Sequence, residues 1–589
     1  MRLLKTSLTA CAIFALCSAI TQPLSAQTEG TTQDYYVNAD MPWHEAVLDS
    51  TGRLLAWYHP EKNLGYDQFL RLDWDFLEHK VPIDTRTGVK VYLTESVFDA
   101  KTLQGVYWQH NPASTFAHLV DVLIGWYPYS GDNSSIAVIR EMLDYQLAHG
   151  TTPSDWDWAG VPFATSCQGD KEYGRCIEDM PKTYYGGIET DKVGELGLGY
   201  VYFYELTGER KYLEAGIKCA DQLAKHIRPG DANHTPWPYR VDAHSGAIIA
   251  GQEYGGMTVA PVRLFRELIR IGEGDASNYK KSAESAWKWI LDNPLNKTSA
   301  AWDKWSGYYE DVFKDTGNQN DITPMMTAYY VLSQDDPASV DPDWKVHVGH
   351  LIDRSRLLLG RGPFFGAWAI DEQLRPDGGL IGAESTNPPA GGLDAHLVPN
   401  EGALLGTDNR GCCSRAGLVC RTSQWGAINA MFYEKTRDGQ AREDAFRSLN
   451  YATYFAMSDG KIACCGVLGQ DLGLWFEDGY GDAGRSFLWA LGAVPAFAPV
   501  GKDHLLRSSS IVQKVTYRSK SISYQTFDKG ASEVFRLSFH PAHIVAGGTA
   551  LSERADLSDD GYTIRNLSDG DCEVRLRHAH SNQVSISGN

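Results

Sequence analysis

Two neighbouring carboxylates lie where a loop leads into a helix. Glu189 and Asp191 follow the glycines at 186 and 187, and Thr190 or Asp191 could cap the helix that starts there. Both acids would then lie near the positive end of the helix dipole. Two interpretations stay open, because these residues could act only as helix caps or could place acid groups at the rim of a cavity.

A second group of acids occurs further along the chain. Glu310 and Asp311 follow two tyrosines, and Asp321 precedes a helix expected near Pro324. Unequal burial of neighbouring carboxyl groups can keep one protonated and the other ionised, which provides an acid and a base. Asp321 could equally act only as a helix cap.

A third candidate segment, residues 475–482, combines glycines with aromatic and acidic side chains. Asp478, Tyr480 and the nearby Arg485 could contact a ligand, because glycines let the backbone approach it closely. The alternative interpretation is a tightly packed loop that supports the C-terminal part of the chain.

Paired carboxylates are the groups that hydrolyse glycosidic bonds, where one donates a proton and the other acts as nucleophile or base. We expect one acid from Glu189 and Asp191 and the other from Glu310, Asp311 and Asp321, because loops between successive hairpins converge on one mouth. The sequence does not give the distance between the carboxyl groups, so retention and inversion both stay open.

Residues for a different reaction are also present. Removal of a proton beside a uronate carboxylate needs a tyrosine or histidine, and a further group that neutralises the carboxylate. Elimination by a lyase and epimerisation of a uronate are therefore the alternatives to hydrolysis. A histidine on an apolar helix, such as His118, is more often a packed core residue. The residues of these types are Asn111 with His118, Glu253 with Tyr254, His396 with Asn400, and Tyr480 with Arg485.

Tryptophans are frequent in the expected connections between helices. Large rings stack on the apolar faces of sugars, although they also dominate ordinary core packing. Their occurrence in loops favours ligand contact. The predicted substrate-binding residues are Trp156, Trp158, Trp237, Arg240, His396, Asp478 and Arg485. The candidate catalytic residues are Asp191, Glu189, Glu310, Asp311, Asp321, Tyr254 and Tyr480.

The cysteines favour disulfides over a metal site. Cys167 and Cys176 bracket a polar stretch and are expected to form a loop disulfide. Adjacent cysteine pairs are a weak zinc signal, so we expect no metal ion and keep zinc as the alternative. That alternative zinc site consists of Cys412, Cys413, Cys464 and Cys465. We also expect no nucleotide cofactor, because the sequence has neither a P-loop nor a dinucleotide-binding fingerprint.

Five α-hairpins are expected to position these residues. In each, an aromatic-rich helix end meets a Gly/Asp turn, and a second helix with apolar residues on one face follows. Irregular spacing and long connections favour a closed ring of hairpins over an open solenoid. Long loops inside a compact domain are usually functional. The hairpins are expected at residues 125–149, 203–226, 267–291, 329–359 and 432–456.

The pattern changes near Arg507, where short alternating stretches separated by turn residues predict an all-β module. The segment before the first hairpin has mixed character and is interpreted as a lead-in. The expected organisation is a signal peptide over 1–26, a lead-in over 27–105, a helical ring over 106–506 and a β-sandwich over 507–589.

The N-terminus predicts export. Arg2 and Lys5 precede a short apolar run, and small residues before Gln27 form a cleavage site, so we expect a secreted or periplasmic protein without a membrane span. The net charge of −20 argues against nucleic acid as a partner, because binding to phosphates needs clustered Lys and Arg. The composition, with 43% hydrophobic and 22% charged residues, is that of a globular protein.

In these features the chain resembles the α/α-toroid carbohydrate-active enzymes, which are glycoside hydrolases and polysaccharide lyases with a helical ring followed by a β-sandwich. The resemblance rests on the β-rich tail and on the hairpin pattern, as in residues 204–208 followed by Lys211 and Tyr212. It implies a mainly α fold, with a six-hairpin or incomplete toroid and a C-terminal sandwich, and an enzyme that cleaves a poly- or oligosaccharide. The resemblance is architectural, so no family's catalytic residues carry over. A non-catalytic glycan-binding protein on the same scaffold is a further alternative.

Overall fold

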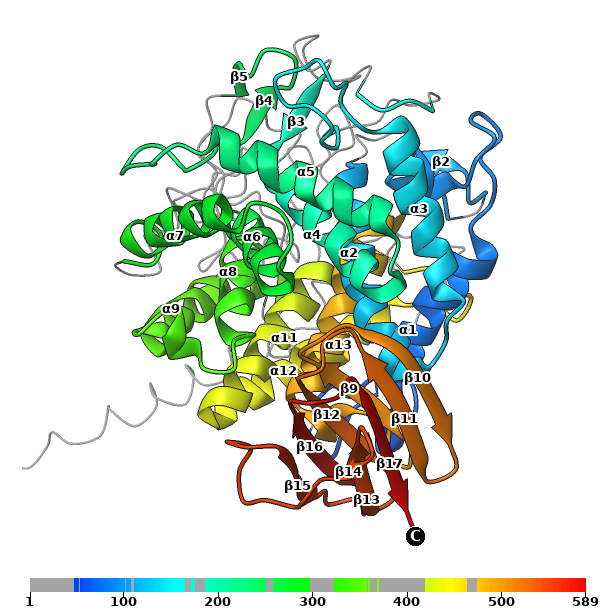
Figure 1. Cartoon of the computed structure of the whole chain (residues 1–589). Coiled ribbons are helices and arrows are strands. Elements are labelled where there is room, and N and C mark those ends of the chain that lie inside the picture. The colour runs from blue at the N-terminus through cyan, green and yellow to red at the C-terminus, as the bar shows by residue number, and fades with distance from the viewer. Residues whose placement is uncertain are drawn as a thin grey trace, which may run out of the picture.

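The chain folds into a ring of helices with a β-sandwich at one end (Figure 1). The computed structural model describes residues 47–51, 53–100, 102–106, 111–164, 171–174, 186–250, 258–296, 322–357, 359–360, 368–369, 419–462 and 474–589. Twelve α-helices lie in these residues and form two concentric layers.

Six helices form the inner layer. Each contacts the next, and the last contacts the first, so the layer is a closed ring. In order around the ring, these helices are α2 (Pro112–Ser130), α4 (Thr190–Thr207), α6 (Val259–Ile271), α8 (Ile322–Leu332), α11 (Val419–Thr436) and α13 (Ala483–Ala493).

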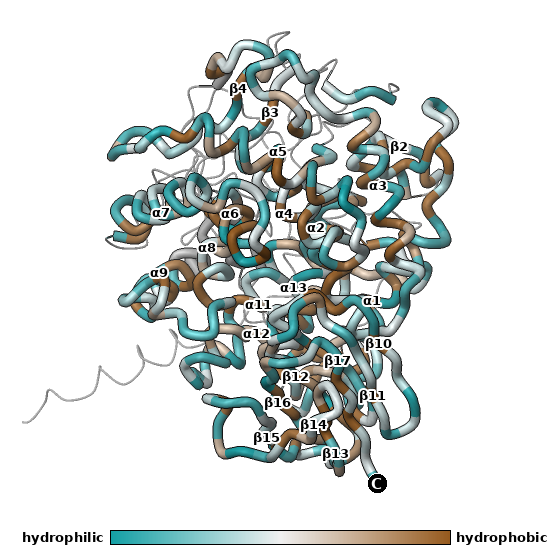
Figure 2. Tube along the Cα trace, viewed as in Figure 1, coloured by the Kyte–Doolittle hydropathy of each residue, from teal (hydrophilic) through white to brown (hydrophobic). Residues whose placement is uncertain are grey.

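Six outer helices cover this ring, and α7 among them alternates between hydrophilic and hydrophobic residues (Figure 2). Five of them follow their inner partner directly and complete the five predicted hairpins. The outer helices are α1 (Leu64–Asp75), α3 (Ser135–His149), α5 (Arg210–His226), α7 (Ala276–Asp292), α9 (Trp344–Leu357) and α12 (Gly439–Ala452).

The sixth pair joins the two ends of the helical region, because α1 packs against α13. The sequence did not predict this pair, since its helices lie about 400 residues apart and neither forms a local hairpin. Helix α1 lies within the segment expected to be a lead-in. The predicted toroid is thus confirmed, as a ring of six helix pairs.

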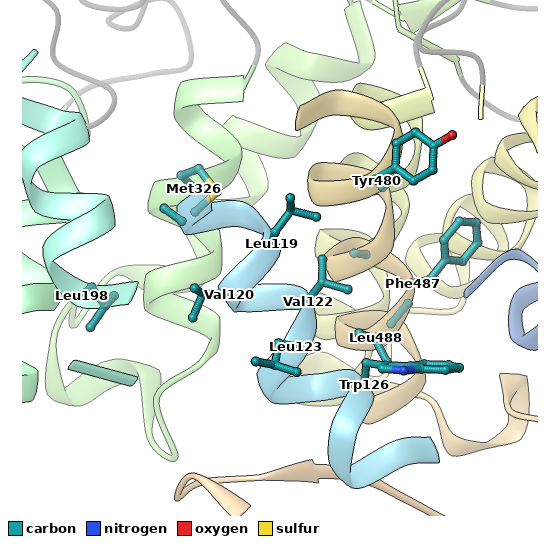
Figure 3. Close-up of a cluster of buried hydrophobic side chains, with 14 of the residues drawn as sticks. Leu119, Val120, Val122, Leu123, Trp126, Leu198, Met326, Tyr480, Phe487 and Leu488 are labelled. Atoms are coloured by element: carbon teal, nitrogen blue, oxygen red, sulfur yellow. The ribbon is translucent and has the colours of Figure 1, made fainter. Parts of the chain in front are cut away.

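Five of the six inner helices begin before the start of the hairpin predicted for them; α2, for example, begins at Pro112, where the hairpin was expected from residue 125. The reason is that inner helices are buried on nearly all sides, so their first turns lack the polar stripe that marks a surface helix. In α2, buried side chains point in several directions, toward Leu198 of α4, Met326 of α8 and Leu488 of α13 (Figure 3).

The inner helices all run in the same direction, with their C-terminal ends at the sandwich. The carbonyl of Pro128 accepts a hydrogen bond from Tyr517, and that of Glu205 accepts one of 2.7 Å from Gln513. The turns at this end are short: α2 and α4 end at Gly131 and Gly208, whose positive φ angles of 74° and 76° favour glycine. The N-terminal ends of the inner helices therefore share the opposite end of the ring, which receives the long connections.

Among the described residues, three small sheets lie outside the sandwich. Next to the start of α4, β3 (Gly187–Glu189) pairs with β4 (Arg240–Asp242), and β4 pairs with β5 (Ile248–Ala250). The other two small sheets consist of strands of two residues each. The second sheet contains β2 (Gly105–Val106), β1 (Val97–Phe98) and β8 (Leu474–Trp475), and the third contains β6 (Leu359–Gly360) and β7 (Trp368–Ala369).

The C-terminal region is a sandwich of two antiparallel sheets, as the sequence predicts, and its first strand begins at His504. One sheet has five strands in the order β10 (Val512–Arg518), β11 (Ser521–Thr526), β17 (Gln583–Gly588), β13 (Pro541–Ala546) and β14 (Thr549–Ala550). The other has four strands in the order β15 (Gly561–Asn566), β16 (Cys572–His578), β12 (Ala531–Leu537) and β9 (His504–Ser508).

Close contact between inner helices depends on small residues. A Cβ atom added to Gly194 of α4 would lie 2.6 Å from the backbone nitrogen of Pro261 in α6. Ring closure thus constrains the sequence of α4 in a way that helix propensity alone does not explain. Across the described residues, every helix falls short of the length and apolar character needed to cross a bilayer.

Candidate functional site

The N-terminal ends of three inner helices bring five ionisable side chains together inside the ring. They are His118 from α2, Asp191 and Glu195 from α4, and Glu477 and Asp482 from the short π-helical segment Phe476–Asp482 that leads into α13. We call them the inner cluster. Charged groups at this depth must be paired, because burial of an isolated charge is costly.

His118 lies at the centre of the inner cluster and is 2% exposed. Its Nε2 lies 3.6 Å from Oε1 of Glu195, and its Nδ1 lies 3.3 Å from Oδ1 of Asp482 and 3.5 Å from Oε1 of Glu477. One imidazole thus separates two carboxylates on one side from a carboxylate of α4 on the other.

The charges around His118 favour its protonated form. Burial and the nearby Arg485 lower the pKa of the imidazole, but the carboxylates of Asp482 and Glu195 outweigh them, so its pKa is raised. A cationic His118 would be the counterion of these two acids.

Asp191 and Glu195 lie one turn apart on α4 and share a cation. The ammonium group of Lys192 lies 3.5 Å from Oδ2 of Asp191 and 3.3 Å from Oε2 of Glu195. Residues four apart lie on the same face of a helix, so both acids face the same region. Within the described residues, all four carboxylate oxygens are buried and lack a hydrogen-bond partner, so Lys192 is their nearby cation.

The two acids have opposite pKa shifts. Burial, with the charges of Glu189 and Glu195, raises the pKa of Asp191 to about 7, although Lys192 opposes this shift. Burial also disfavours ionisation of Glu195, but Lys192, His118 and Arg485 outweigh it and lower its pKa. Near neutral pH, Asp191 can therefore hold a proton while Glu195 is ionised, the combination that acid–base catalysis requires.

Glu477 is the most accessible acid of the inner cluster, with a side chain 23% exposed. The hydroxyl of Ser114, in the first turn of α2, donates a 2.6 Å hydrogen bond to its Oε1. Burial and the charges of Asp478 and Asp482 raise the pKa of Glu477. It is thus a second acid able to carry a proton.

Asp482 is held ionised by arginines. Burial opposes its ionisation, but Arg485, His118 and Arg421 lower its pKa. It forms an ion pair with Arg485, and Nη1 of Arg421 lies 3.6 Å from its Oδ2. Arg485 was predicted to bind substrate. It is 1% exposed, and its ion pair with Asp482 is buried.

Glu189 has a different environment from Asp191. Its Oε1 accepts a 2.6 Å hydrogen bond from Nε of Arg240, and its Oε2 accepts one of 2.8 Å from the amide of Asn111. The three buried residues tie β3, β4 and the start of α2 together. Glu189 was predicted to be catalytic and Arg240 to bind substrate. This geometry favours a structural role for both.

Three other predicted site residues are packed in the core. The hydroxyl of Tyr480 donates to the carbonyl of Gly460 and accepts from the amide of Ile462, and its ring stacks on Phe76. Two predicted substrate-binding rings, Trp158 and Trp237, are 1% and 3% exposed. Their surroundings favour packing over sugar stacking.

Trp156 and Asp478 keep partial exposure. The Trp156 ring contacts Phe163 and His244 edge-on, which leaves part of it accessible. Several predicted residues lie outside the described residues: Glu310, Asp311, Asp321, Tyr254, His396, Cys412, Cys413, Cys464 and Cys465, and the expected Cys167–Cys176 disulfide.

A divalent cation is one group that part of the inner cluster could hold. The ligand atoms of His118, Glu477 and Asp482 lie within 4.8 Å of one another. Arg485 already pairs with Asp482, and Ser114 already bonds to Glu477, so these acids are partly neutralised without an ion. We therefore describe the inner cluster as a set of acid and base groups that exchange protons.

Sequence reasoning gave no catalytic role to Glu195, Lys192 or Glu477. It named His118 among the residues for the lyase alternative but favoured a packed core residue. The spacing of four between Asp191 and Glu195, on a helix expected to start at Thr190, was the available signal. The contacts of His118 with Asp482 had no such signal, because they form only when α13 closes the ring on α2.

The fold and this site define an α/α-toroid protein with a buried acid–base cluster and a C-terminal β-sandwich. Neither a search of protein-family models nor a search of curated proteins gives a match. Among solved structures, the chain is similar to cellobiose 2-epimerase from Spirochaeta thermophila DSM 6192, with 11% identity and a TM-score of 0.50 over 74% of this chain and 98% of that one.

Weaker similarities involve a D-mannose isomerase (10% identity, TM-score 0.47, 75% of this chain and 99% of that one) and an α-1,2-mannosidase from Trichoderma reesei (11% identity, TM-score 0.42, 73% and 86%). These structures are enzymes that process carbohydrates. At 11% identity, the likeness to the cellobiose 2-epimerase shows the fold alone.

Proposed function

We propose that this protein is a carbohydrate-active enzyme that hydrolyses glycosidic bonds in a poly- or oligosaccharide, with Asp191 and Glu195 as its paired carboxylates. One observation carries the proposal: two acids on one helix face share the cation of Lys192, and their pKa values are shifted in opposite directions. Glycoside hydrolysis needs such a pair, one acid protonated and the other ionised.

In this reaction Asp191 donates its proton to the oxygen of the leaving sugar as the glycosidic C–O bond breaks. The ionised carboxylate of Glu195 stabilises the positive charge that develops at the anomeric carbon, as nucleophile or as base toward water. If Glu195 is the nucleophile, it bonds to the anomeric carbon, and water then breaks that bond and gives its proton to Asp191. If Glu195 is the base, water attacks the anomeric carbon directly and gives its proton to Glu195, and exchange with solvent returns both acids to their starting states. The products are two saccharides with no change in oxidation state.

The surroundings of the pair support these roles. Lys192 and His118 stabilise the negative charge of Glu195. The fold adds support, because one similar solved structure is an enzyme whose name refers to a disaccharide.

A second function is favoured by His118. Its imidazole faces carboxylates on both sides, and within the described residues neither ring nitrogen has a hydrogen-bond partner. A histidine of this kind could move a proton to or from a sugar carbon, as β-elimination or epimerisation requires. The likeness to an epimerase is consistent with this alternative.

The proposal includes export, from the signal sequence expected over residues 1–26. The test is expression of the full gene followed by N-terminal sequencing of the protein outside the cytoplasm. A mature chain that starts at Gln27 would support export, and a protein that stays in the cytoplasm with Met1 intact would contradict it.

The test of function is an activity screen of the mature chain on neutral and acidic oligosaccharides. Release of reducing ends without ultraviolet absorbance supports hydrolysis. Absorbance of an unsaturated uronate indicates elimination, and a changed sugar configuration without cleavage indicates epimerisation. Binding of an oligosaccharide without any of these changes would indicate a non-catalytic glycan-binding protein.

Variants connect the reaction with the pair. Asp191→Asn is expected to lower kcat by about 10²–10⁴-fold, the usual contribution of a general acid. The control is Glu284→Gln, whose exposed side chain lies on outer helix α7. Full activity in Asp191→Asn would show that Asp191 is not the catalytic acid.

A further inference from the structure

A cavity lies at the other end of the ring from the inner cluster, between the C-terminal ends of the inner helices and the sandwich. Its volume is about 600 Å³, within the range of roughly 300–1,000 Å³ typical of small-molecule sites. Residues from α2, α4, α8, α11 and α13 line it on one side, and residues from β9, β12 and β16 line it on the other. We call it the junction cavity.

The junction cavity is separate from the inner cluster. None of the five inner-cluster side chains is among its lining residues, although the lining reaches Asp121 of α2, one helical turn from His118. A molecule in the junction cavity therefore does not contact the proposed catalytic pair.

The lining is more cationic than the protein as a whole. It contains five cationic and four acidic side chains, in a chain whose net charge is −20. Three of the acids have partners of their own: Glu434 pairs with Arg507 and Arg575, Asp121 with Arg485, and Glu533 with His578. Among the acids of the described lining, this leaves Asp335, on the exposed edge, to offset the remaining cations.

Those remaining cations are Lys435, Arg437 and Arg577. Among the residues that the structure describes, none of the three forms an ion pair with a carboxylate. Lys435 and Arg577 donate instead to backbone carbonyls, Lys435 at 2.8 Å to that of Gln334 and Arg577 at 2.9 Å to that of Ser558. The guanidinium of Arg437 lies over the ring of Tyr433. The charge of all three is thus available to an anion.

Hydroxyl groups lie on the sandwich side of the same cavity. Ser508, Ser509, Ser510 and Ser532 line it. The Oγ of Ser509 accepts a hydrogen bond from the amide of Ser532, and that of Ser510 binds Asp528. Serine hydroxyls beside guanidinium groups suit a ligand that carries both an oxyanion and hydroxyl groups.

We propose that the junction cavity binds a sugar that carries an oxyanion, with the anionic group held by Lys435, Arg437 and Arg577 and the sugar hydroxyls facing the serines. The carboxylate of a sugar acid and the phosphate of a sugar phosphate share this chemistry. Helices α8 and α11 and the sandwich all contribute walls, so the site exists only when ring and sandwich are packed together. The inference does not depend on the reaction at the inner cluster.

The experiment is calorimetric titration of the full chain with glucuronate, glucose 6-phosphate, glucose and inorganic phosphate. At least one anionic sugar is expected to bind about tenfold tighter than glucose and than phosphate alone, and to bind more weakly as salt is added. The tighter of the two anionic sugars identifies the oxyanion. Equal affinity for glucose and both anionic sugars, or no binding of either anionic sugar at millimolar concentration, would overturn the proposal.

Variants locate the site. Arg577→Gln and Lys435→Gln are each expected to weaken binding by about tenfold, because each removes one charge-assisted contact. The matched control is Arg518→Gln, an exposed arginine of the sandwich outside the cavity. Asp191→Asn is expected to bind as the wild type does. Binding that is lost in Asp191→Asn and kept in both cavity variants would place the ligand at the inner cluster and contradict the proposal.

Discussion

Nη1 of Arg485 in α13 donates a hydrogen bond of 3.2 Å to Oδ2 of Asp121 in α2, across 364 positions of the chain. Asp121 also attracts Arg263 of α6, whose Nη2 lies 4.0 Å from its Oδ1. One carboxylate therefore joins three inner helices near the axis of the ring, including the two that close it. Because Arg485 also pairs with Asp482, this contact supports the inner cluster.

Asp121→Ala should destabilise the protein. The change leaves the buried guanidinium of Arg263 without its carboxylate and removes one of the two partners of Arg485. Loss of one partner of a buried pair costs about 3–5 kcal/mol, measured as the free energy of unfolding in urea. Asp292→Ala, which breaks an exposed pair with Lys288, should cost less than about 1 kcal/mol. Equal effects of the two changes would show that Asp121 does not hold the ring.

Activity should depend on a proton at Asp191. Its pKa is raised to about 7, mainly by burial, and the proposed acid works only when protonated. Accordingly, kcat should fall as pH rises through about 7. A pH–rate profile on a cleaved oligosaccharide measures this limb, and a rate that stays constant up to pH about 9 would exclude Asp191 as the acid.

Lys192, the cation shared by Asp191 and Glu195, should set the pH at which kcat falls on the alkaline side. Lys192 lowers the pKa of both Asp191 and Glu195, so Lys192→Met should raise both. The alkaline limb of kcat should then move to higher pH, by about one unit or more. Lys288→Met, on the outer helix α7, should leave the profile in place. A limb that moves to lower pH in Lys192→Met would contradict the assignment of the acid.

The ring could be predicted from local patterns only in part. Helices such as α5 show a buried face that includes Tyr212, Cys219 and Leu223, and this periodicity gave five hairpins. The pairing of α1 with α13 had no local signal, because its energy comes from contacts between distant segments.

In the candidate site too, features with a local sequence signal could be predicted, and those that depend on contacts between distant segments could not. Asp191 was predicted because a helix start is visible in the sequence, and it lies in the inner cluster. The separate roles of Glu189 and Asp191 were not predictable, because they depend on Arg240, which reaches Glu189 through the pairing of β3 with β4. For His118, the apolar helix around it indicated packing, and only the closed ring shows its acidic neighbours.

The interface between ring and sandwich should respond to acid through Glu434. Burial opposes ionisation of this carboxyl, but Arg507 and Arg575 outweigh it and lower its pKa from 4.5 to about 2. A group whose pKa is lowered by folding stabilises the protein above its unfolded pKa, and this contribution is lost as pH falls toward the folded value. Glu434 should therefore stabilise the packed protein at neutral pH and progressively less between pH about 4.5 and about 2.

Glu434→Gln tests this contribution at nearly constant shape. At pH 7 it should lower the free energy of unfolding by about 2 kcal/mol, below the usual cost of breaking a buried pair because the Arg507 side chain is 40% exposed. At pH 3 the variant and the wild type should differ by less, since the wild-type carboxyl is then closer to its folded pKa. Urea unfolding at both pH values measures the two differences, with Glu284→Gln as the exposed control. If the difference were larger at pH 3 than at pH 7, the ion pairs of Glu434 would not be what joins the sandwich to the ring.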